Sequence, residues 1–175
     1  MARPLIPVRD DLQLFEGYHS PQVEVDVRLN TNESPYPPPA AWRDAFLEEL
    51  AAVPFNRYPD REATALRTAI GELHGVGPEQ ILAGNGSNEV IQALCLAYGG
   101  AGRTVAVFEP TYALHSHIPR ITGTGVAVGE RRADFTLDPA EVTRVLTEAN
   151  PAITFLCSPN NPTGVIDSTE VIEAA

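Results

Sequence analysis

The chain has 175 residues, which is enough for one domain or for one domain with a small appendage. Its 23 acidic residues outnumber its 12 basic residues, and a net charge of −11 repels nucleic-acid phosphates and anionic lipids, so we exclude both as partners. No apolar run reaches membrane-spanning length, and residues 1–10 lack the apolar core of a signal peptide. With two cysteines and no CxxC motif, we expect reduced thiols and a cytoplasmic protein.

The first part of the chain is expected to hold an arm and two helices. Residues 1–35 are interrupted by prolines and glycines and lack helical periodicity, so they predict an extended N-terminal arm with a short strand over 23–29. Apolar side chains then recur at helical spacing. This spacing predicts helices over residues 40–53 and 62–74, each closed by proline or glycine.

From residue 80 onward, short apolar runs alternate with helical patterns. The expected strands are 80–83, 104–108, 125–129 and 152–157, and the expected helices are 87–98, 111–121, 138–149 and one that begins at Thr169. This alternation predicts an α/β fold with a largely parallel sheet. Ligands of such sheets bind at the carboxyl ends of the strands, where the candidate loops are 84–88, 109–112 and 158–164.

The string GNGSNE over residues 84–89 is a candidate phosphate-binding loop. Its two glycines allow the backbone to approach a ligand closely, and Ser87 can cap the following helix. The free N–H groups and the positive end of that helix favour an anion such as a phosphate. An ordinary strand-to-helix turn fits the string equally well. The string is neither GxGxxG nor a Walker loop, which argues against a nucleotide-binding domain.

The other two loops present an aromatic ring and an amide. Tyr112, after Glu109 and Pro110, is placed to stack on a planar cofactor, although a tyrosine there is more often a packing residue. The string SPNNPTG over residues 158–164 predicts a rigid loop with a cis peptide. Its Asn161 amide can donate a hydrogen bond to a phenolate-like oxygen. A plain Asn/Pro/Gly loop is the alternative, but the length of the string favours function.

Two further patterns are weaker. The string NRYPD over residues 56–60 is either an ordinary turn or a turn that presents Tyr58 across a subunit interface. His115 and His117 lie two residues apart in an expected helix, where they do not face one another. We therefore predict no metal site.

Five strings together resemble a known family. LNTNESPY, NRYPD, GNGSNE, PTY and SPNNPTG begin at residues 29, 56, 84, 110 and 158. In this order and spacing they resemble the histidinol-phosphate aminotransferases, which are fold-type I pyridoxal-phosphate enzymes. The resemblance covers nearly the whole chain but only about the first half of a complete member. It implies a three-layer α/β/α fold, with an arm over residues 1–35 and the incomplete large domain that binds pyridoxal phosphate over residues 36–175.

The resemblance implies that the cofactor is pyridoxal 5'-phosphate, and it assigns residues to it. Ser87, Asn88 and the backbone at Gly86 would hold the phosphate. Tyr112 would stack against the pyridine ring, and Asn161 would donate a hydrogen bond to its phenolic oxygen.

The resemblance also implies a homodimer and a substrate class. Tyr58 would reach the cofactor phosphate of the partner subunit, and Tyr18, Asn32 and Glu33 would lie near the substrate. The implied reaction moves an amino group between histidinol phosphate or imidazole-acetol phosphate and glutamate or 2-oxoglutarate, a step of histidine biosynthesis. An aromatic amino-acid aminotransferase or a threonine-phosphate decarboxylase is the alternative.

One departure from the family limits what these residues can do. The chain contains no lysine, and the family's Schiff-base lysine, pyridine-binding aspartate and substrate-binding arginines all fall beyond residue 175. We therefore expect the 175 residues alone to be inactive. A degenerate or complementing module that binds pyridoxal phosphate without catalysis is the non-enzyme alternative.

Overall fold

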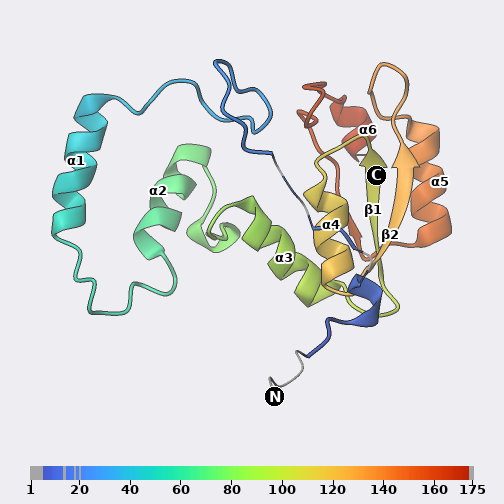
Figure 1. The fold of residues 1–175 in the computed structure, drawn as a ribbon, viewed down its shortest axis with the longest axis horizontal. Coiled ribbons are helices and arrows are strands. Elements are labelled where there is room, and N and C mark those ends of the chain that lie inside the picture. The colour runs from blue at the N-terminus through green and yellow to red at the C-terminus, as the bar shows by residue number, and fades with distance from the viewer. Residues whose placement is uncertain (1–5, 14, 18, 20, 174–175) are drawn as a thin grey trace. The chain divides into compact units, whose positions relative to one another are not determined.

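The computed structural model describes residues 6–13, 15–17, 19 and 21–173. These fall into two compact units, and Figure 1 shows their elements in chain order. One unit comprises the described parts of Met1–Tyr18 and Gly84–Ala175, and the other comprises those of His19–Ala83. The division into an arm over 1–35 and a domain over 36–175 stays a prediction.

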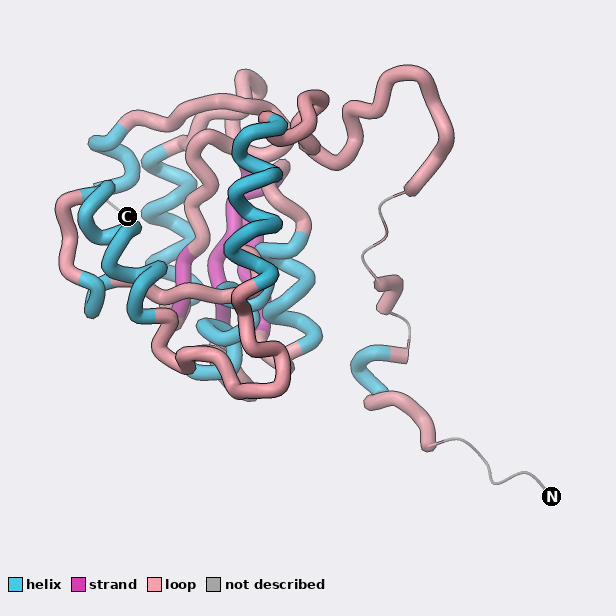
Figure 2. Tube along the Cα trace, turned by 90° about the vertical axis from the view of Figure 1, so that its left-hand side faces the viewer, coloured by secondary structure: helices cyan, strands magenta, loops and turns pink. Residues whose placement is uncertain are grey.

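The first unit is built on a three-stranded parallel sheet. Its order is β2-β1-β3, formed by Gly125–Glu130, Thr104–Glu109 and Ile153–Thr154, and Figure 2 shows the strands running side by side. All six residues of β1 pair in parallel with β2, and Val105 and Ala106 pair in parallel with β3. The predicted parallel sheet is therefore confirmed.

Helices cover both faces of this sheet. α3 (Ser87–Tyr98) and α4 (Leu114–Ile121) contribute one cluster of buried side chains, against which Ile153 and Phe155 pack. α5 (Pro139–Ala149) contributes a second cluster. β1 lies between them and is buried along its length, which explains its unbroken apolar run. The α/β class expected from the alternation is confirmed.

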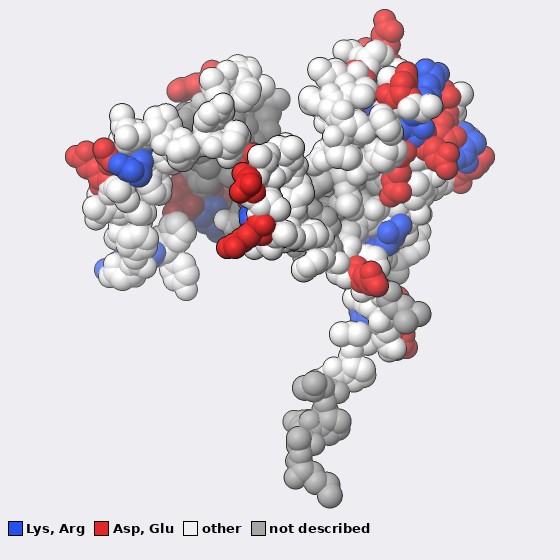
Figure 3. All heavy atoms as spheres, turned by 45° about the horizontal axis from the view of Figure 1, so that its top comes forward, with Lys and Arg blue, Asp and Glu red and all other residues white. Residues whose placement is uncertain are grey.

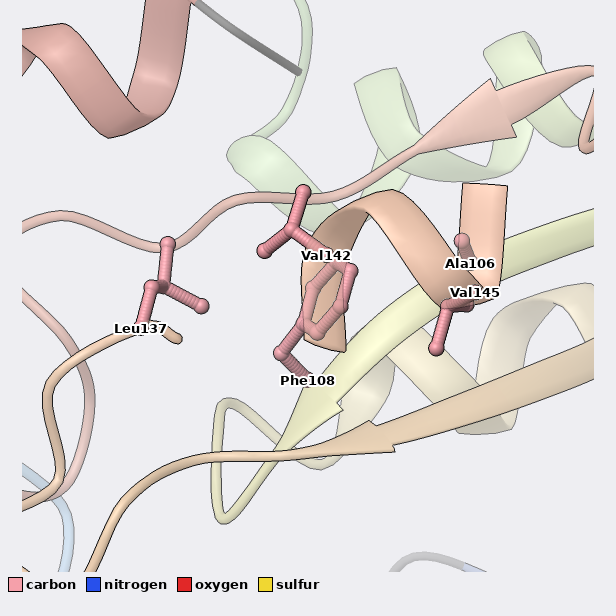
Figure 4. Packing of buried hydrophobic residues seen from close by; sticks show 5 residues of the cluster. All are labelled: Ala106, Phe108, Leu137, Val142 and Val145. Atoms are coloured by element: carbon pink, nitrogen blue, oxygen red, sulfur yellow. The ribbon is translucent and has the colours of Figure 1, made fainter. Parts of the chain in front are cut away.

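The second cluster is centred on Phe108 of β1. Its ring points toward Val142 and Val145 of α5, with Ala106 and Leu137 beside them (Figure 4). All five side chains are buried. The strand end that carries the candidate loops is therefore held by a packed aromatic side chain.

Local signals place the start of α5. Asp138 occupies the N-cap position and its carboxylate accepts a hydrogen bond from the Ala140 amide at 3.0 Å, while Pro139 opens the helix. On its exposed face, Arg144 bridges Glu141 at 2.7 Å and Glu148 at 2.6 Å. Figure 3 shows acidic and basic side chains interspersed on part of the molecular surface.

β3 is shorter than the predicted strand over 152–157. The ladder ends at Thr154, apart from a bond from the Phe155 amide to the Ala106 carbonyl at 2.9 Å. Beyond it, the carbonyls of Phe108 and Cys157 accept hydrogen bonds from the guanidinium of Arg131 instead. A side chain therefore replaces the ladder at this end of the sheet.

The second unit holds α1 (Ala40–Ala51), α2 (Thr64–His74) and a short 3₁₀ helix, η2 (Pro78–Gln80). Both predicted helices are confirmed, with ends that differ by one or two residues. The guanidinium of Arg67 joins α2 to η2 by donating to the Pro78 carbonyl at 2.6 and 2.9 Å. α2 ends at Gly75, whose positive φ of 70° suits a residue without a side chain.

Two predicted strands are wrong. Residues 23–29 alternate valines with polar residues, yet the segment curls on itself, and the Asn30 amide donates to the Pro21 carbonyl at 2.8 Å. Residues 80–83 follow η2 as irregular chain. A strand needs a neighbour to pair with, and the described residues supply none for either segment.

The described part of the N-terminal arm is not simply extended. Asp10–Leu12 form a 3₁₀ helix, η1, and the ring of Phe15 packs against His117 of α4 with centroids 4.5 Å apart. The α6 helix (Thr169–Glu173) begins where expected. Among the described residues, no helix combines the length and apolar character needed to cross a membrane.

Candidate functional site

The loop before α3 leaves backbone donors available. Gly86 takes the N-cap position with φ +83°, and nothing lies within 4 Å of where its Cβ would be. The possible serine cap is wrong, because the helix starts at Ser87 and no side chain caps it. The amides of Ser87 and Asn88 belong to the first turn, which has no intrahelical acceptor. The Asn85 amide instead donates to the carboxylate of Glu89.

A hydrogen bond joins this loop to the next one. The Tyr112 hydroxyl donates to Oδ1 of Asn88 at 3.0 Å. The Tyr112 ring, which is half-buried, is thereby fixed beside the amino-terminal turn of α3. Two residues predicted to bind one ligand, 24 positions apart in sequence, are therefore in direct contact.

His115 supports the Tyr112 ring from α4. The two rings meet edge to face at 5.3 Å, and the imidazole stacks on Phe155 at 4.8 Å with an interplanar angle of 9°. Burial lowers the pKa of His115, and its Nδ1 is buried without a partner. The imidazole therefore acts as a packing group against Phe155, whereas that of His117 packs on Phe15.

The loop over residues 158–164 is tied together by Asn160. Asn160 is 2% exposed; its side-chain amide donates to the Pro110 carbonyl at 3.0 Å and to the Thr163 hydroxyl at 2.9 Å. Its backbone amide donates to the Val165 carbonyl at 2.7 Å and its carbonyl accepts from the Gly164 amide at 2.6 Å. The loop that carries half-buried Asn161 is therefore bonded to the loop that carries Tyr112.

The backbone of this loop contains cis peptide bonds. The bonds before Pro159 and Pro162 are cis, as is the bond before Pro110. The expected cis peptide is therefore confirmed. Asn161 lies between the buried Asn160 and Pro162 at the carboxyl edge of the sheet.

A buried ion pair beneath this loop was not predicted. Nη1 of Arg131 lies 2.8 Å from Oδ2 of Asp167, and the two side chains are 1% and 2% exposed. Arg131 also donates to the carbonyls of Phe108, Phe135 and Cys157. No local pattern marks this pair, since its members are distant in sequence and neither belongs to a recognisable motif.

The remaining candidate residues belong to the second unit or lie outside the described residues. Tyr58 is fully exposed, and Asn32, with φ of 55°, and Glu33 lie on irregular chain in the second unit. Tyr18 lies outside the described residues. Their predicted roles stay predictions.

The first unit thus offers free helix amides, an aromatic ring and a side-chain amide along one sheet edge. This combination suits a planar ligand that carries an anionic group. Comparison with known proteins gives the class. Residues 24–175 match the model of the aminotransferase class I and II family, and the chain belongs to this family.

The relatives refine the comparison. The chain is 47% identical to the histidinol-phosphate aminotransferase of Frankia casuarinae, over 97% of its own length and 45% of the relative's. The chain therefore spans slightly less than half of that relative. The resemblance drawn from the five strings is confirmed.

Solved structures agree on the fold. The aspartate aminotransferase of Thermus thermophilus with maleate matches with a TM-score of 0.73 and 27% identity, over 83% of this chain and 40% of that one. The histidinol-phosphate aminotransferase of Sinorhizobium meliloti in complex with pyridoxal-5'-phosphate matches with a TM-score of 0.67 and 22% identity, over 75% and 35%. At that identity, the second likeness supports the fold alone. The predicted fold-type I class is confirmed.

Proposed function

We propose that these residues form the first part of an enzyme that transfers an amino group between histidinol phosphate or imidazole-acetol phosphate and glutamate or 2-oxoglutarate. The observation that carries the proposal is the bond between Tyr112 and Asn88, which joins an aromatic platform to a helix start. The level of identity to a histidinol-phosphate aminotransferase supports the choice of substrate. We also assign the enzyme to the cytoplasm, in keeping with its two free cysteines.

The proposed cofactor is pyridoxal 5'-phosphate, and the residues present fit it. The space beside Gly86 admits a phosphate that the amides of Ser87 and Asn88 can bind. Tyr112 is placed to cover one face of the pyridine ring, and the Asn161 amide to donate to its phenolic oxygen. Bound pyridoxal phosphate supplies an electron sink, while the protein supplies orientation and charge.

Asn88 contributes two groups to this arrangement. Its backbone amide belongs to the turn proposed to bind phosphate, and its side-chain oxygen accepts from Tyr112. Tyr112 and the start of α3, which would hold the ring and the phosphate of the cofactor, are therefore joined by one hydrogen bond.

The second unit is proposed to serve the partner subunit and the substrate. The full exposure of Tyr58 leaves its hydroxyl available to reach the cofactor phosphate of a second copy in a homodimer. Asn32 and Glu33, together with Tyr18, are proposed to lie near the substrate. These assignments come from the family resemblance.

The absence of lysine limits the 175 residues by themselves. No side chain among them can form a Schiff base with the cofactor's aldehyde. We propose that they bind pyridoxal phosphate noncovalently and do not catalyse transfer. Borohydride treatment of the mixture should leave no cofactor attached to a mass-verified 175-residue sample, and measurable turnover by that sample would contradict the proposal.

The decisive experiment uses the gene product at its encoded length. Glutamate formation from histidinol phosphate and 2-oxoglutarate is expected, with pyridoxal phosphate retained through gel filtration. Tyrosine and threonine phosphate serve as competing substrates, because preference for either would point to the alternative enzymes. Arg144→Gln, on the exposed face of α5, is the matched control for Asn161→Ala. Failure to bind pyridoxal phosphate would overturn the proposal.

A further inference from the structure

The loop that carries Asn161 is anchored at both ends to one guanidinium. Before the loop, the Cys157 carbonyl accepts from Nη2 of Arg131 at 3.1 Å. After the loop, the Asp167 carboxylate pairs with Nη1 of Arg131 at 2.8 Å. Arg131 itself follows β2 directly, and its backbone amide donates to the Glu109 carbonyl at 2.8 Å. The base of the loop is therefore fixed to the carboxyl ends of β1 and β2.

Asp167 makes two further hydrogen bonds. Its second carboxylate oxygen accepts from the Leu137 amide at 2.8 Å, and its backbone amide donates to the Ser158 hydroxyl at 3.2 Å. The bond to Ser158 crosses the base of the loop and closes it. Each ionised side chain is thus surrounded by hydrogen-bonding partners, which a buried pair requires.

The location of the Arg131–Asp167 ion pair indicates a role beyond packing. Buried ion pairs are weak evidence of stability, because desolvation offsets much of their attraction. This pair, however, is placed under the loop whose amide is proposed to touch the cofactor, and Asn160 then links that loop to Pro110. A shift of the loop base would therefore move Asn161 relative to Tyr112.

We propose that Arg131 and Asp167 are positioning residues for Asn161: their ion pair closes the base of loop 158–164 and holds the Asn161 amide in place to bind the cofactor. The inference rests on the proposed function. It assigns to the pair no contact with cofactor or substrate. Its effect is carried by the Cys157 carbonyl and by the hydrogen bond between the Asp167 amide and the Ser158 hydroxyl.

The first test reads the loop without cofactor. Hydrogen exchange is measured at the Asn160 and Gly164 amides, which are bonded within the loop, in the cofactor-free gene product at its encoded length. Asp167→Asn keeps the shape but removes the charge, and should speed exchange at both amides by roughly tenfold. Ser158→Ala is the milder second variant if Asp167→Asn fails to fold. Arg144→Gln should leave both rates unchanged. Unchanged rates in Asp167→Asn or, where it does not fold, in Ser158→Ala would overturn the inference.

The second test reads the cofactor. A hydrogen bond from Asn161 favours the ionised phenolic oxygen, so Asn161→Ala should raise the pH midpoint of the cofactor's absorbance change by roughly one unit. Asp167→Asn should raise it in the same direction by roughly half a unit. In the double variant the midpoint should match that of Asn161→Ala, because displacing the loop has no further effect once the amide is absent.

Failure of this inference and failure of the proposed function give different results. Additive shifts in the double variant would show that the pair affects the cofactor's ionisation independently of Asn161, and would overturn the inference while leaving the proposed function intact. A wild-type protein that binds no pyridoxal phosphate would overturn the proposed function, and with it the role of the pair toward the cofactor. That case is recognised by the missing absorbance in every variant.

Discussion

The two units of this chain both contain helices predicted from apolar spacing, but they differ in how far their side chains are buried. In the first unit, the sheet strand β1 is buried between helices, and its Phe108 is 1% exposed. In the second unit, Gly71 is the sole buried residue among those described, and Phe46 of α1 is 47% exposed. An apolar periodicity therefore predicts that a helix forms but does not determine whether its apolar face is covered.

The contrast is sharpest for aromatic side chains. Trp42 and Phe46 of α1 stack on one another at 5.4 Å and stay largely exposed, whereas Phe108 is enclosed by side chains of α5. Among the described residues, only the first unit encloses such a ring in a cluster of buried side chains. The candidate cofactor residues in contact with one another belong to that packed unit.

The largest effect is expected from the core aromatic ring. Phe108→Ala should lower the free energy of unfolding by about 3–5 kcal/mol, because it leaves a cavity between β1 and α5. Phe46→Ala, on the exposed face of α1, should cost less than about 1 kcal/mol. Urea unfolding followed by circular dichroism measures both. Equal costs would contradict the difference between the two units.

The second-largest loss of stability is expected from breaking the buried ion pair. Asp167→Ala leaves Arg131 buried without its counter-ion and should cost about 3 kcal/mol, since three carbonyl acceptors remain. Glu62→Ala breaks the exposed pair with Arg67 in the second unit, where the atoms lie 3.5 Å apart, and should cost less than about 1 kcal/mol. Thermal unfolding of the two variants at equal salt compares them. A smaller loss for Asp167→Ala than for Glu62→Ala would refute this ranking.

A smaller loss of stability is expected from removing the N-cap of α5. Asp138 caps α5, whereas α1 begins after Pro39 without a side-chain cap. Asp138→Ala should therefore cost about 1 kcal/mol, while Asp138→Asn, which keeps the acceptor, should retain most of the stability. Urea midpoints measured for both variants test the cap, and an equal loss in both would assign the effect to the charge instead.

The smallest effect is a dependence on pH. Because burial lowers the pKa of His115, the unfolded chain binds its proton more readily than the folded chain. The contribution of His115 is therefore fully present above the unfolded pKa of about 6.5 and is lost as the pH falls below it. His115→Gln should flatten the loss of stability between pH 7.5 and 5.5, and Arg144→Gln, which removes no group that titrates in this range, should not. Urea unfolding at several pH values measures both, and an unchanged slope in His115→Gln would contradict the assignment.

Much of the site was predictable because its signals are local. The glycines at 84 and 86 and the helical pattern after them place the start of α3 at Ser87. The string SPNNPTG predicts a rigid loop with Asn161 at the strand end. The contact between Tyr112 and Asn88 follows only once two loops meet at one sheet edge.

The sequence by itself determined the helices, the central parallel strands and the strings that carry the family resemblance, because each depends on periodicity or turn chemistry within a few residues. Tertiary structure alone decided that residues 23–29 and 80–83 form no strand, that β3 stops at Thr154, and that Arg131 pairs with Asp167. A strand requires a neighbour and a buried charge requires a counter-ion. Only the fold brings the neighbouring strand or the counter-ion into contact with its partner.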